Sequence, residues 1–266
     1  MEMAQFRQTC VYCGETGVTK EHFWGKWTRH IGSPSDDQTS QHILVKWDDP
    51  TSYFGSKQVQ KGRLGRPGTP RSQTLKIACR RCNGGWMSRI VENAKPVLEK
   101  LSAGKWENLT PDERVYLSAW ASLFACSYEF ADVATVCTPQ SERDWLRLNG
   151  RPSNNWRIWI GVVNEALTLP DWVQHRALML PNEIDWDGHR KMHITYQVFD
   201  QLCILSFFSE YKFNLDWILF SRWNCIHPLW PISSDPMSKP FLQQTAESLI
   251  YAVDTLCNTL NQEFRT

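Results

Sequence analysis

The chain has 266 residues, of which 42% are hydrophobic, and a formal net charge of +1. This length allows one large or two modest domains, and the composition is ordinary for a soluble protein. No apolar run approaches the roughly 18 to 20 residues of a membrane span, and the first residues lack the basic and apolar segments of a secretory signal. We therefore expect a cytoplasmic protein without a membrane partner.

The charges are distributed unevenly along the chain. Residues 1–100 hold 16 Lys and Arg against 9 Asp and Glu, a net of +7, whereas residues 101–266 hold 13 against 19, a net of −6. Between Asp49 and Glu92 there are nine basic residues and no acidic one. A basic run is often only a solvated surface, but nine cations without a counter-charge favour contact with nucleic acid. The predicted contact residues are Lys57, Lys61, Arg63, Arg66, Arg71, Arg80 and Arg81.

Two CxxC pairs lie in the first hundred residues, at Cys10 and Cys13 and at Cys79 and Cys82. Each pair forms a tight turn that directs two thiolates to one point, and two pairs complete the tetrahedral ligand set of a structural zinc ion. Such a site alone indicates folding rather than activity, because a zinc ribbon without chemistry can show the same spacing. The other five cysteines lie in apolar surroundings and are interpreted as reduced core thiols: Cys126, Cys137, Cys203, Cys225 and Cys257.

An acid and an imidazole, Glu21 and His22, follow the first CxxC pair. Hydrolysis of a phosphodiester requires a base that deprotonates water and a divalent ion that neutralises the phosphate and the leaving oxygen, and this pair suits both tasks. Neighbouring side chains of a strand point to opposite faces. We therefore expect the strand to end at this pair, so that both side chains can serve one centre.

The order of these elements resembles the HNH family, the ββα-metal endonucleases, in a zinc-containing branch found in phage and bacterial proteins. The matching elements are Cys10/Cys13, Lys20-Glu21-His22, a hairpin region at 42–66, the strand Leu75-Lys-Ile-Ala78, and Cys79/Cys82 running into Asn83-Gly-Gly-Trp-Met-Ser88. The resemblance covers roughly residues 8–100. It is specific because five separate elements occur in the right order.

The resemblance implies that Glu21 coordinates a catalytic metal ion, that His22 is the general base and that Asn83 is the second protein ligand. Oxygen ligands with open water positions suit Mg²⁺ or Mn²⁺. Two positions depart from the family pattern. Thr74 stands where an Asn normally supports the catalytic His, so this role falls to Thr74, to Gln73 or to no residue, and Met87 stands where some members have a His. With two side-chain ligands, we expect metal binding to be weak without substrate.

Local patterns around these motifs predict a helical segment at 23–30, a strand at 42–47, a turn at 48–52 and a strand at 74–78. The segment 55–70, rich in glycine, proline and basic residues, is predicted to be a mobile hairpin or a loop that orders on DNA.

A helix is predicted to begin near Asn83 and to continue until Pro96 interrupts it. Gly84 and Gly85 in its first turn either let the backbone approach metal and phosphate or give only a loose helix start.

After Gly104 the pattern changes to that of a second domain. Thr110 as cap, followed by Pro111 and two acids, predicts a helix that continues to residue 130, and a shorter helix covers 141–149 and ends at Gly150. Strands are predicted at 156–163, 172–180, 192–199, 202–208 and 217–222, followed by an amphipathic helix at 245–260. The histidines of this half have no metal-ligand spacing and are interpreted as structural: His175, His189, His193 and His227.

The predicted fold class is α+β. We expect a zinc-containing ββα-metal (HNH) nuclease module at 1–104, followed at 105–266 by an α+β domain with a mainly antiparallel sheet. The second domain is expected to select a substrate or partner, or to form a homo-oligomer interface.

The leading hypothesis for function is a Mg²⁺- or Mn²⁺-dependent endonuclease acting on double-stranded DNA, which by resemblance belongs to a phage or to a bacterial defence or mobile element. One alternative is a zinc module that binds nucleic acid without turnover. Another is a regulatory protein in which 105–266 binds the partner. The pair Glu21 and His22 with Asn83 favours the enzyme, because a module that only binds has no need of an imidazole beside an acid.

Overall fold

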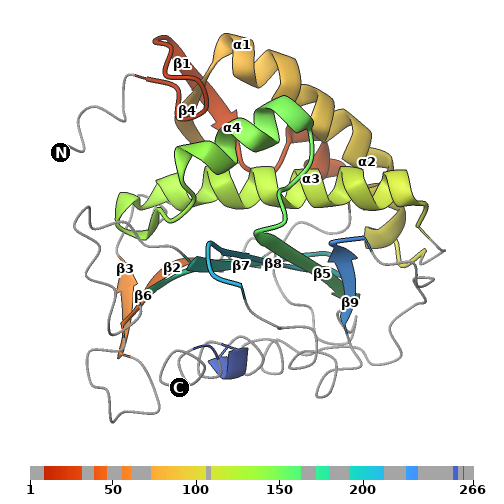
Figure 1. Ribbon diagram of the computed structural model, residues 1–266. Coiled ribbons are helices and arrows are strands. Elements are labelled where there is room, and N and C mark those ends of the chain that lie inside the picture. The colour runs from red at the N-terminus through yellow and green to blue at the C-terminus, as the bar shows by residue number, and fades with distance from the viewer. Residues whose placement is uncertain are drawn as a thin grey trace.

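The structure is a computed structural model that describes residues 9–31, 39–46, 56–60, 73–105, 109–162, 172–179, 192–212, 226–232, 254–256 and 260. It is an α+β fold, in which helices and a small hairpin lie over one face of a large, mainly antiparallel sheet (Figure 1). The α+β class predicted from the sequence is confirmed at this level.

The N-terminal hairpin is a two-stranded antiparallel sheet of β1 (Val18–His22) and β4 (Thr74–Cys79). The turn before β1 carries the first CxxC pair, and the N–H of Val11 donates to the carbonyl of Ile77 (2.9 Å), which ties this turn to β4. After β1, the 3₁₀ helix η2 (Lys26–His30) provides the helical segment predicted there. The strand predicted at 74–78 is confirmed as β4.

One helical run follows β4, and it begins earlier than predicted. It consists of α1 (Arg80–Cys82), the π-helical turn η4 (Asn83–Met87) and α2 (Ser88–Ser102). The predicted start near Asn83 is wrong by three residues, because the Cys79 thiol caps the helix by accepting from the N–H of Cys82 (3.5 Å). Gly85 has a non-helical backbone conformation, φ −105° and ψ −109°, and kinks the run at this turn.

Pro96 lies inside α2, so the prediction that it interrupts the helix is also wrong. A proline in a helix interior costs about 3 kcal/mol. The next turn, however, buries Val97, Leu98 and Leu101 in the apolar core. Burial of three aliphatic side chains at about 1.5 to 3 kcal/mol each outweighs the proline penalty.

The central helix is α3 (Pro111–Tyr128), which begins with the predicted cap. The Thr110 hydroxyl accepts from the N–H of Glu113, and the Glu113 carboxylate accepts from the N–H of Thr110, so both halves of a capping box are present. From Leu117 onward every residue of α3 is buried, which is typical of a helix covered on all sides. Two short 3₁₀ helices, η5 (Glu129–Ala131) and η6 (Val133–Thr135), follow it.

Helix α4 (Gln140–Asn149) ends as predicted at Gly150, whose φ of 63° is the left-handed conformation that glycine adopts without strain. Its side chains reach the N-terminal turn. The Arg143 guanidinium donates to the carbonyl of Val11 (2.9 Å) and the Gln140 amide donates to the carbonyl of Tyr12 (3.3 Å).

Within the described residues, the large sheet has seven strands in the order β3-β2-β6-β7-β8-β5-β9. All neighbours are antiparallel except β2 and β6, which are parallel. The strands are β2 (Thr39–Lys46), β3 (Ser56–Gln60), β5 (Trp156–Val162), β6 (Trp172–Met179), β7 (Met192–Phe199), β8 (Leu202–Ser209) and β9 (Ile226–Trp230).

Five of the predicted strands agree with these strands: those at 42–47, 156–163, 172–180, 192–199 and 202–208. The sequence missed β9 because Pro228 interrupts its pattern. A proline is tolerated there because β9 is the last of the described strands of the sheet, where one side of the backbone needs no ladder partner. The strand predicted at 217–222 lies outside the described residues, as does most of the helix predicted at 245–260, of which 254–256 and 260 are described and helical.

The strands β2 and β3 form an antiparallel hairpin within the region expected at 42–66, but β2 also pairs along its length with β6. Chain segments from both predicted domains therefore form one sheet. A single apolar cluster likewise extends from Cys10 to Trp230. The division at residue 104 stays a prediction.

No helix within the described ranges combines the length and the apolar character needed to cross a bilayer.

Candidate active site and metal centre

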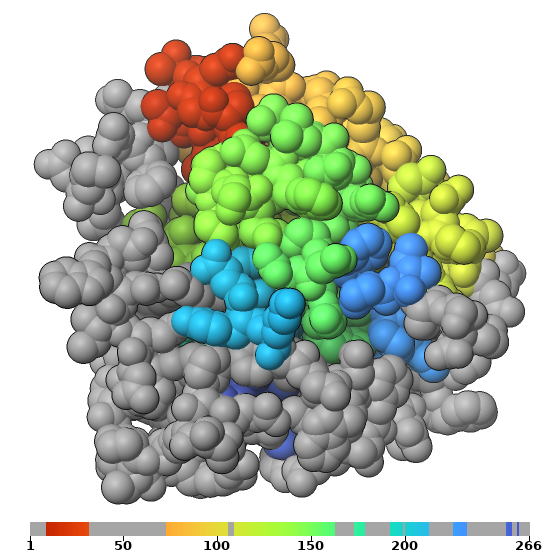
Figure 2. All heavy atoms as spheres, in the orientation of Figure 1, coloured from red at the N-terminus to blue at the C-terminus, as the bar shows by residue number. Residues whose placement is uncertain are grey.

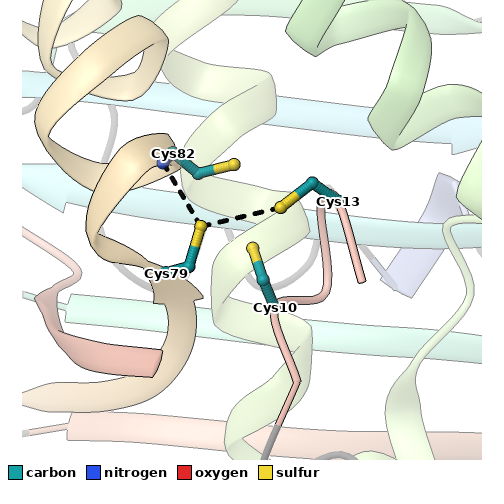
Figure 3. Close-up of side chains that lie close together, drawn as sticks. All are labelled: Cys10, Cys13, Cys79 and Cys82. Carbon is teal, nitrogen blue, oxygen red and sulfur yellow. Dashed lines mark hydrogen bonds between the residues drawn. The ribbon is translucent and has the colours of Figure 1, made fainter. Parts of the chain in front are cut away.

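The four cysteines of the two CxxC pairs converge on one point (Figure 3). Cys10 and Cys13 come from the turn before β1, Cys79 ends β4 and Cys82 lies in α1. Their sulfur atoms all lie within 4.8 Å of one another, and the Sγ atoms of Cys13 and Cys79 are 3.6 Å apart. Zinc bonded to sulfur at about 2.3 Å in a tetrahedron needs sulfur separations of about 3.8 Å. The cluster can therefore hold a metal ion such as zinc.

The local backbone explains why the first pair folds into this shape. The N–H of Gly14 donates to the carbonyl of Cys10 (2.8 Å), and Gly14 has φ +74°, a conformation that few side-chain-bearing residues adopt. Burial raises the pKa of the Cys10 and Cys82 thiols, so a metal that binds them displaces their protons. The three other described cysteines, Cys126, Cys137 and Cys203, are buried and unpaired by disulfides, as predicted.

Glu21, His22 and Asn83 line one small cavity of about 130 Å³. His22 is the last residue of β1, which lets it and its neighbour Glu21 reach the same space, and Asn83 begins the turn η4. The rest of the wall comes from the segment after β1, from α2 with its preceding turn, and from α3: Phe23, Gly25, Met87, Ser88, Val91, Trp120, Leu123, Phe124 and Ser127.

A short chain of hydrogen bonds fixes the Asn83 side chain. Its amide nitrogen donates to the Thr19 hydroxyl (3.1 Å), which in turn donates to the carbonyl of Ala78 (3.1 Å). Because Nδ2 is held by β1, the amide oxygen Oδ1 is left as the acceptor atom of this side chain. The carbonyl oxygen is the atom with which an asparagine coordinates a hard cation.

The two titratable groups of the cavity are displaced in opposite directions by burial. Desolvation raises the pKa of Glu21 from 4.5 to about 7. Desolvation lowers the pKa of His22, and the positive charges of Lys26 and Arg29 lower it further. The Nδ1 atom of His22 is buried and has no hydrogen-bond partner among the described residues. The cavity therefore presents a largely desolvated acid beside a neutral imidazole.

The two positions that depart from the HNH pattern both lie near this cavity. Thr74 is the cross-strand partner of His22. The carbonyl of Gln73 accepts a hydrogen bond from the N–H of Phe23, the residue after His22 (3.3 Å). The side-chain Nε2 of Gln73 has no hydrogen-bond partner among the described residues. In the described part of the chain, neither the Thr74 nor the Gln73 side chain forms a hydrogen bond with the imidazole, and the Met87 side chain lines the cavity.

Few of the residues predicted to contact nucleic acid lie within the described part of the chain. Lys61, Arg63, Arg66 and Arg71 lie outside the described residues, and of Lys57 only the place of its backbone in β3 is described. Arg80 and Arg81 are exposed at the start of the helical run. Arg81 forms an ion pair with Glu15 (2.6 Å) beside the cysteine cluster.

Sequence reasoning missed the contribution of α3 to the cavity. Phe124 and Tyr128 of this helix pack against Phe23, with ring centroids 6.3 Å and 5.0 Å apart, and the Ser127 hydroxyl lies 2.6 Å from the Tyr12 hydroxyl. No local motif in α3 marks it as a partner of β1. The density of large apolar residues at 117–128 is the signal that could have shown a helix covered on more than one side.

Two histidines interpreted as structural, His175 and His193, are fully buried in the sheet with hydrogen-bonded rings, which confirms the prediction. His227 lies on the edge strand β9, and His189 lies outside the described residues.

Comparisons of the chain with models of protein families, with curated proteins and with solved structures find no match. The likeness to the HNH family therefore depends on the motif residues alone.

Proposed function

We propose that this protein is a metal-dependent endonuclease that hydrolyses phosphodiester bonds of DNA at an HNH-type site. One observation carries the proposal. Glu21 and His22 are separated from Asn83 by about sixty residues of chain, yet all three line one cavity, and the Cys10, Cys13, Cys79 and Cys82 cluster lies at the other end of β4. The order of a hairpin followed by a helix also agrees with the ββα pattern.

The residues present fit a hard divalent cation. The Glu21 carboxylate is largely buried, its pKa rises to about 7 through desolvation alone, and no described basic side chain forms an ion pair with it. A cation is the partner that would keep this acid ionised. The carboxylate and the Asn83 Oδ1 are both oxygen donors, as Mg²⁺ or Mn²⁺ prefers. When bound, such an ion would neutralise the phosphate and the leaving oxygen.

His22 is suited to be the general base. Its lowered pKa keeps the imidazole neutral near pH 7, and a neutral ring has one nitrogen free to accept a proton from water. The Thr19 hydroxyl accepts a hydrogen bond from the Asn83 amide nitrogen and so orients the Asn83 amide oxygen.

The test is cleavage of a supercoiled plasmid by the full chain with Mg²⁺, with Mn²⁺ or with EDTA. We expect nicked or linear product only with a divalent ion. His22→Ala should lower the hydrolysis rate by about 10² to 10⁴ and leave zinc content and DNA affinity unchanged. Glu21→Ala and Asn83→Ala should fail at low Mg²⁺ and recover partly at high Mg²⁺ or with Mn²⁺.

His30→Ala is the matched control, because His30 is exposed at the end of η2 and does not line the cavity. It should cleave like the wild type. Wild-type cleavage by His22→Ala would instead remove the imidazole from the mechanism.

The alternative is a zinc protein that binds nucleic acid without turnover. The observation that favours it is the apolar character of the cavity, where Met87, Val91, Trp120, Leu123 and Phe124 supply no ligand. A wild-type protein that binds DNA but leaves every DNA and RNA intact with both ions would decide for this alternative.

A further inference from the structure

The outer face of the β1–β4 hairpin carries an unusual pair of cations. Lys20 on β1 is the cross-strand partner of Lys76 on β4, and both side chains are exposed. Directly opposed residues in an antiparallel pair have Cβ atoms about 4.5 to 5.5 Å apart, and like charges in such a pair are destabilising. The fold alone gives no reason to place two lysines there.

In the described segments that form this hairpin, no carboxylate on this face offsets the two lysines. Residues 9–31 contain two acids, Glu15 and Glu21, and residues 73–82 contain none. Glu15 is paired with Arg81, and Glu21 alternates to the other side of β1 from Lys20. Neither lysine forms an ion pair with any described residue. Within the described residues, no ion pair relieves the repulsion between them, so an external anion would stabilise the pair.

The same face leads to the candidate active site. Side chains two residues apart in a strand share a face, so His22 and its cross-strand partner Thr74 follow Lys20 and Lys76 at a distance of about 6.6 Å along the strands. Beyond His22, the 3₁₀ helix η2 carries two more exposed cations, Lys26 and Arg29, which form no ion pair with the described residues. His22 thus lies near four cations: Lys20 and Lys76 on the same face of the hairpin, and Lys26 and Arg29 on η2, which follows it in the chain.

We propose that the Lys20–Lys76 pair binds the phosphate backbone of duplex DNA and, with Lys26 and Arg29 on the other side of His22, aligns one strand across the cavity. The charge identifies the occupant: a group of exposed cations that form no ion pair with the described residues matches the regular phosphates of a duplex. This inference names the substrate-binding surface of the proposed nuclease and so rests on that function. It uses residues outside the predicted contact set, in which Lys20, Lys26, Arg29 and Lys76 do not appear.

Figure 2 shows the β1 segment at the surface of the molecule, next to the start of the helical run. The hairpin lies at the side of α3 remote from the large sheet (Figure 1). A duplex on this face would therefore contact the hairpin and η2 rather than the sheet.

The experiment measures binding of a short fluorescently labelled DNA duplex to the full, zinc-containing chain without added divalent ion, over a range of salt concentrations. Wild type is compared with Lys20→Gln/Lys76→Gln. The slope of log K against log salt is about −0.9 for each phosphate contact, so the double variant should lose about 2 from the magnitude of the slope, about equally for different DNA sequences.

The matched control is Lys105→Gln/Lys212→Gln, which removes two exposed lysines outside the hairpin and η2. Its slope should equal that of the wild type. The melting temperature of Lys20→Gln/Lys76→Gln should be unchanged or higher, because a repulsive cross-strand pair has been removed. Should this double variant fail to fold, the Lys20→Gln single variant replaces it, with an expected loss of about 1 in the slope.

An unchanged slope in the lysine variant, or an equal fall in the control, would overturn the inference. The outcome is independent of turnover. If the wild type binds through these lysines but never cleaves, the endonuclease proposal fails and the binding surface stands. If it cleaves while the slope is unaffected, the proposed function stands and this surface does not.

Discussion

Two regions of this molecule contain an acid and a histidine whose pKa values are displaced in the same way. Burial raises the pKa of Glu21 to about 7 at the cavity, and burial likewise raises the pKa of Glu129 to about 7 in the core. Burial lowers the pKa of His22 in the first region and that of His175 and His193 in the second. If pKa shifts alone were used to find functional sites, both regions would be candidates.

Their hydrogen bonds separate them. One oxygen of Glu129 accepts from the N–H groups of Cys137 (2.9 Å) and Thr138 (3.0 Å) and from the Thr138 hydroxyl (3.1 Å), while the other lies 3.8 Å from Arg143. The Thr138 hydroxyl also lies 3.1 Å from Nε2 of His193. This buried polar network, Arg143–Glu129–Thr138–His193, joins α4 to β7.

The cavity shows the opposite pattern. Glu21 makes no hydrogen bond or ion pair with a described residue, and Nδ1 of His22 has no partner there. A perturbed pKa therefore points to chemistry only where the polar atoms remain available to a ligand, and elsewhere it reports the cost of a sealed polar core.

The largest expected effect tests what holds the cavity region together. Cys79→Ser should lose the metal and unfold β1 and β4, because the apparent free energy of zinc binding, about 10 to 16 kcal/mol in zinc-finger peptides, is also folding free energy. The readouts are elemental analysis and hydrogen exchange of the hairpin amides.

Cys137→Ser is the control for the cysteine variant. The Cys137 thiol donates to the carbonyl of Thr135 (3.5 Å), a bond that serine can replace, so this variant should keep its metal. Freshly purified, reduced wild type without zinc would contradict the prediction.

The next effect tests the buried polar network. Arg143→Met leaves Glu129 without its cation in a fully buried position, and breaking a buried pair costs about 3 to 5 kcal/mol. Arg147→Met, on the same helix, breaks the partly exposed pair with Asp144 and should cost less than about 1 kcal/mol. Urea unfolding measures both, and equal losses would show that the network contributes nothing specific.

The smallest effect is a pH dependence that isolates His175. Burial lowers its pKa from 6.5 to about 4, although the hydrogen bond to the Thr135 carbonyl acts in the other direction. As pH falls, the His175 ring is protonated in the unfolded state at a higher pH than in the folded state. The stability that His175 contributes is therefore complete above pH 6.5 and is lost as pH falls towards 4, by up to about 3 kcal/mol. Glu129 acts with the opposite sign: its contribution is complete below pH 4.5 and is lost as pH rises through about 7.

The Glu129 contribution is present in both wild type and His175→Gln, so it cancels in the difference between their free energies of unfolding. The stability advantage of the wild type should therefore shrink between pH 6.5 and pH 4, as measured by urea unfolding at each pH. An advantage that is constant across this range would mean that the ring is charged in the folded protein or that its burial has no cost.

The sequence by itself determined the local features. The spacing within each CxxC pair predicted that its two thiols share one point, because each tight turn aims its own two sulfur atoms, whereas the pairing of β1 with β4 brought the two pairs together. Thr110, Pro111 and Glu113 fixed the start of α3, and Gly150 fixed the end of α4, because a cap depends on backbone groups within one turn. The alternation and aromatic content of the strands located most of the large sheet.

The tertiary structure decided which of these helices, strands and motifs contact one another. It placed α3 against the cavity, paired β2 with β6, carried α2 through Pro96, and opposed Lys20 to Lys76 across the hairpin. It also buried Glu129 and His193 among hydrogen-bond partners, whereas Glu21 and His22 line a cavity. Each of these outcomes depends on burial and hydrogen bonding between residues far apart in the chain. Such contacts carry no local signal, because the free energy that selects them comes from the whole packed core.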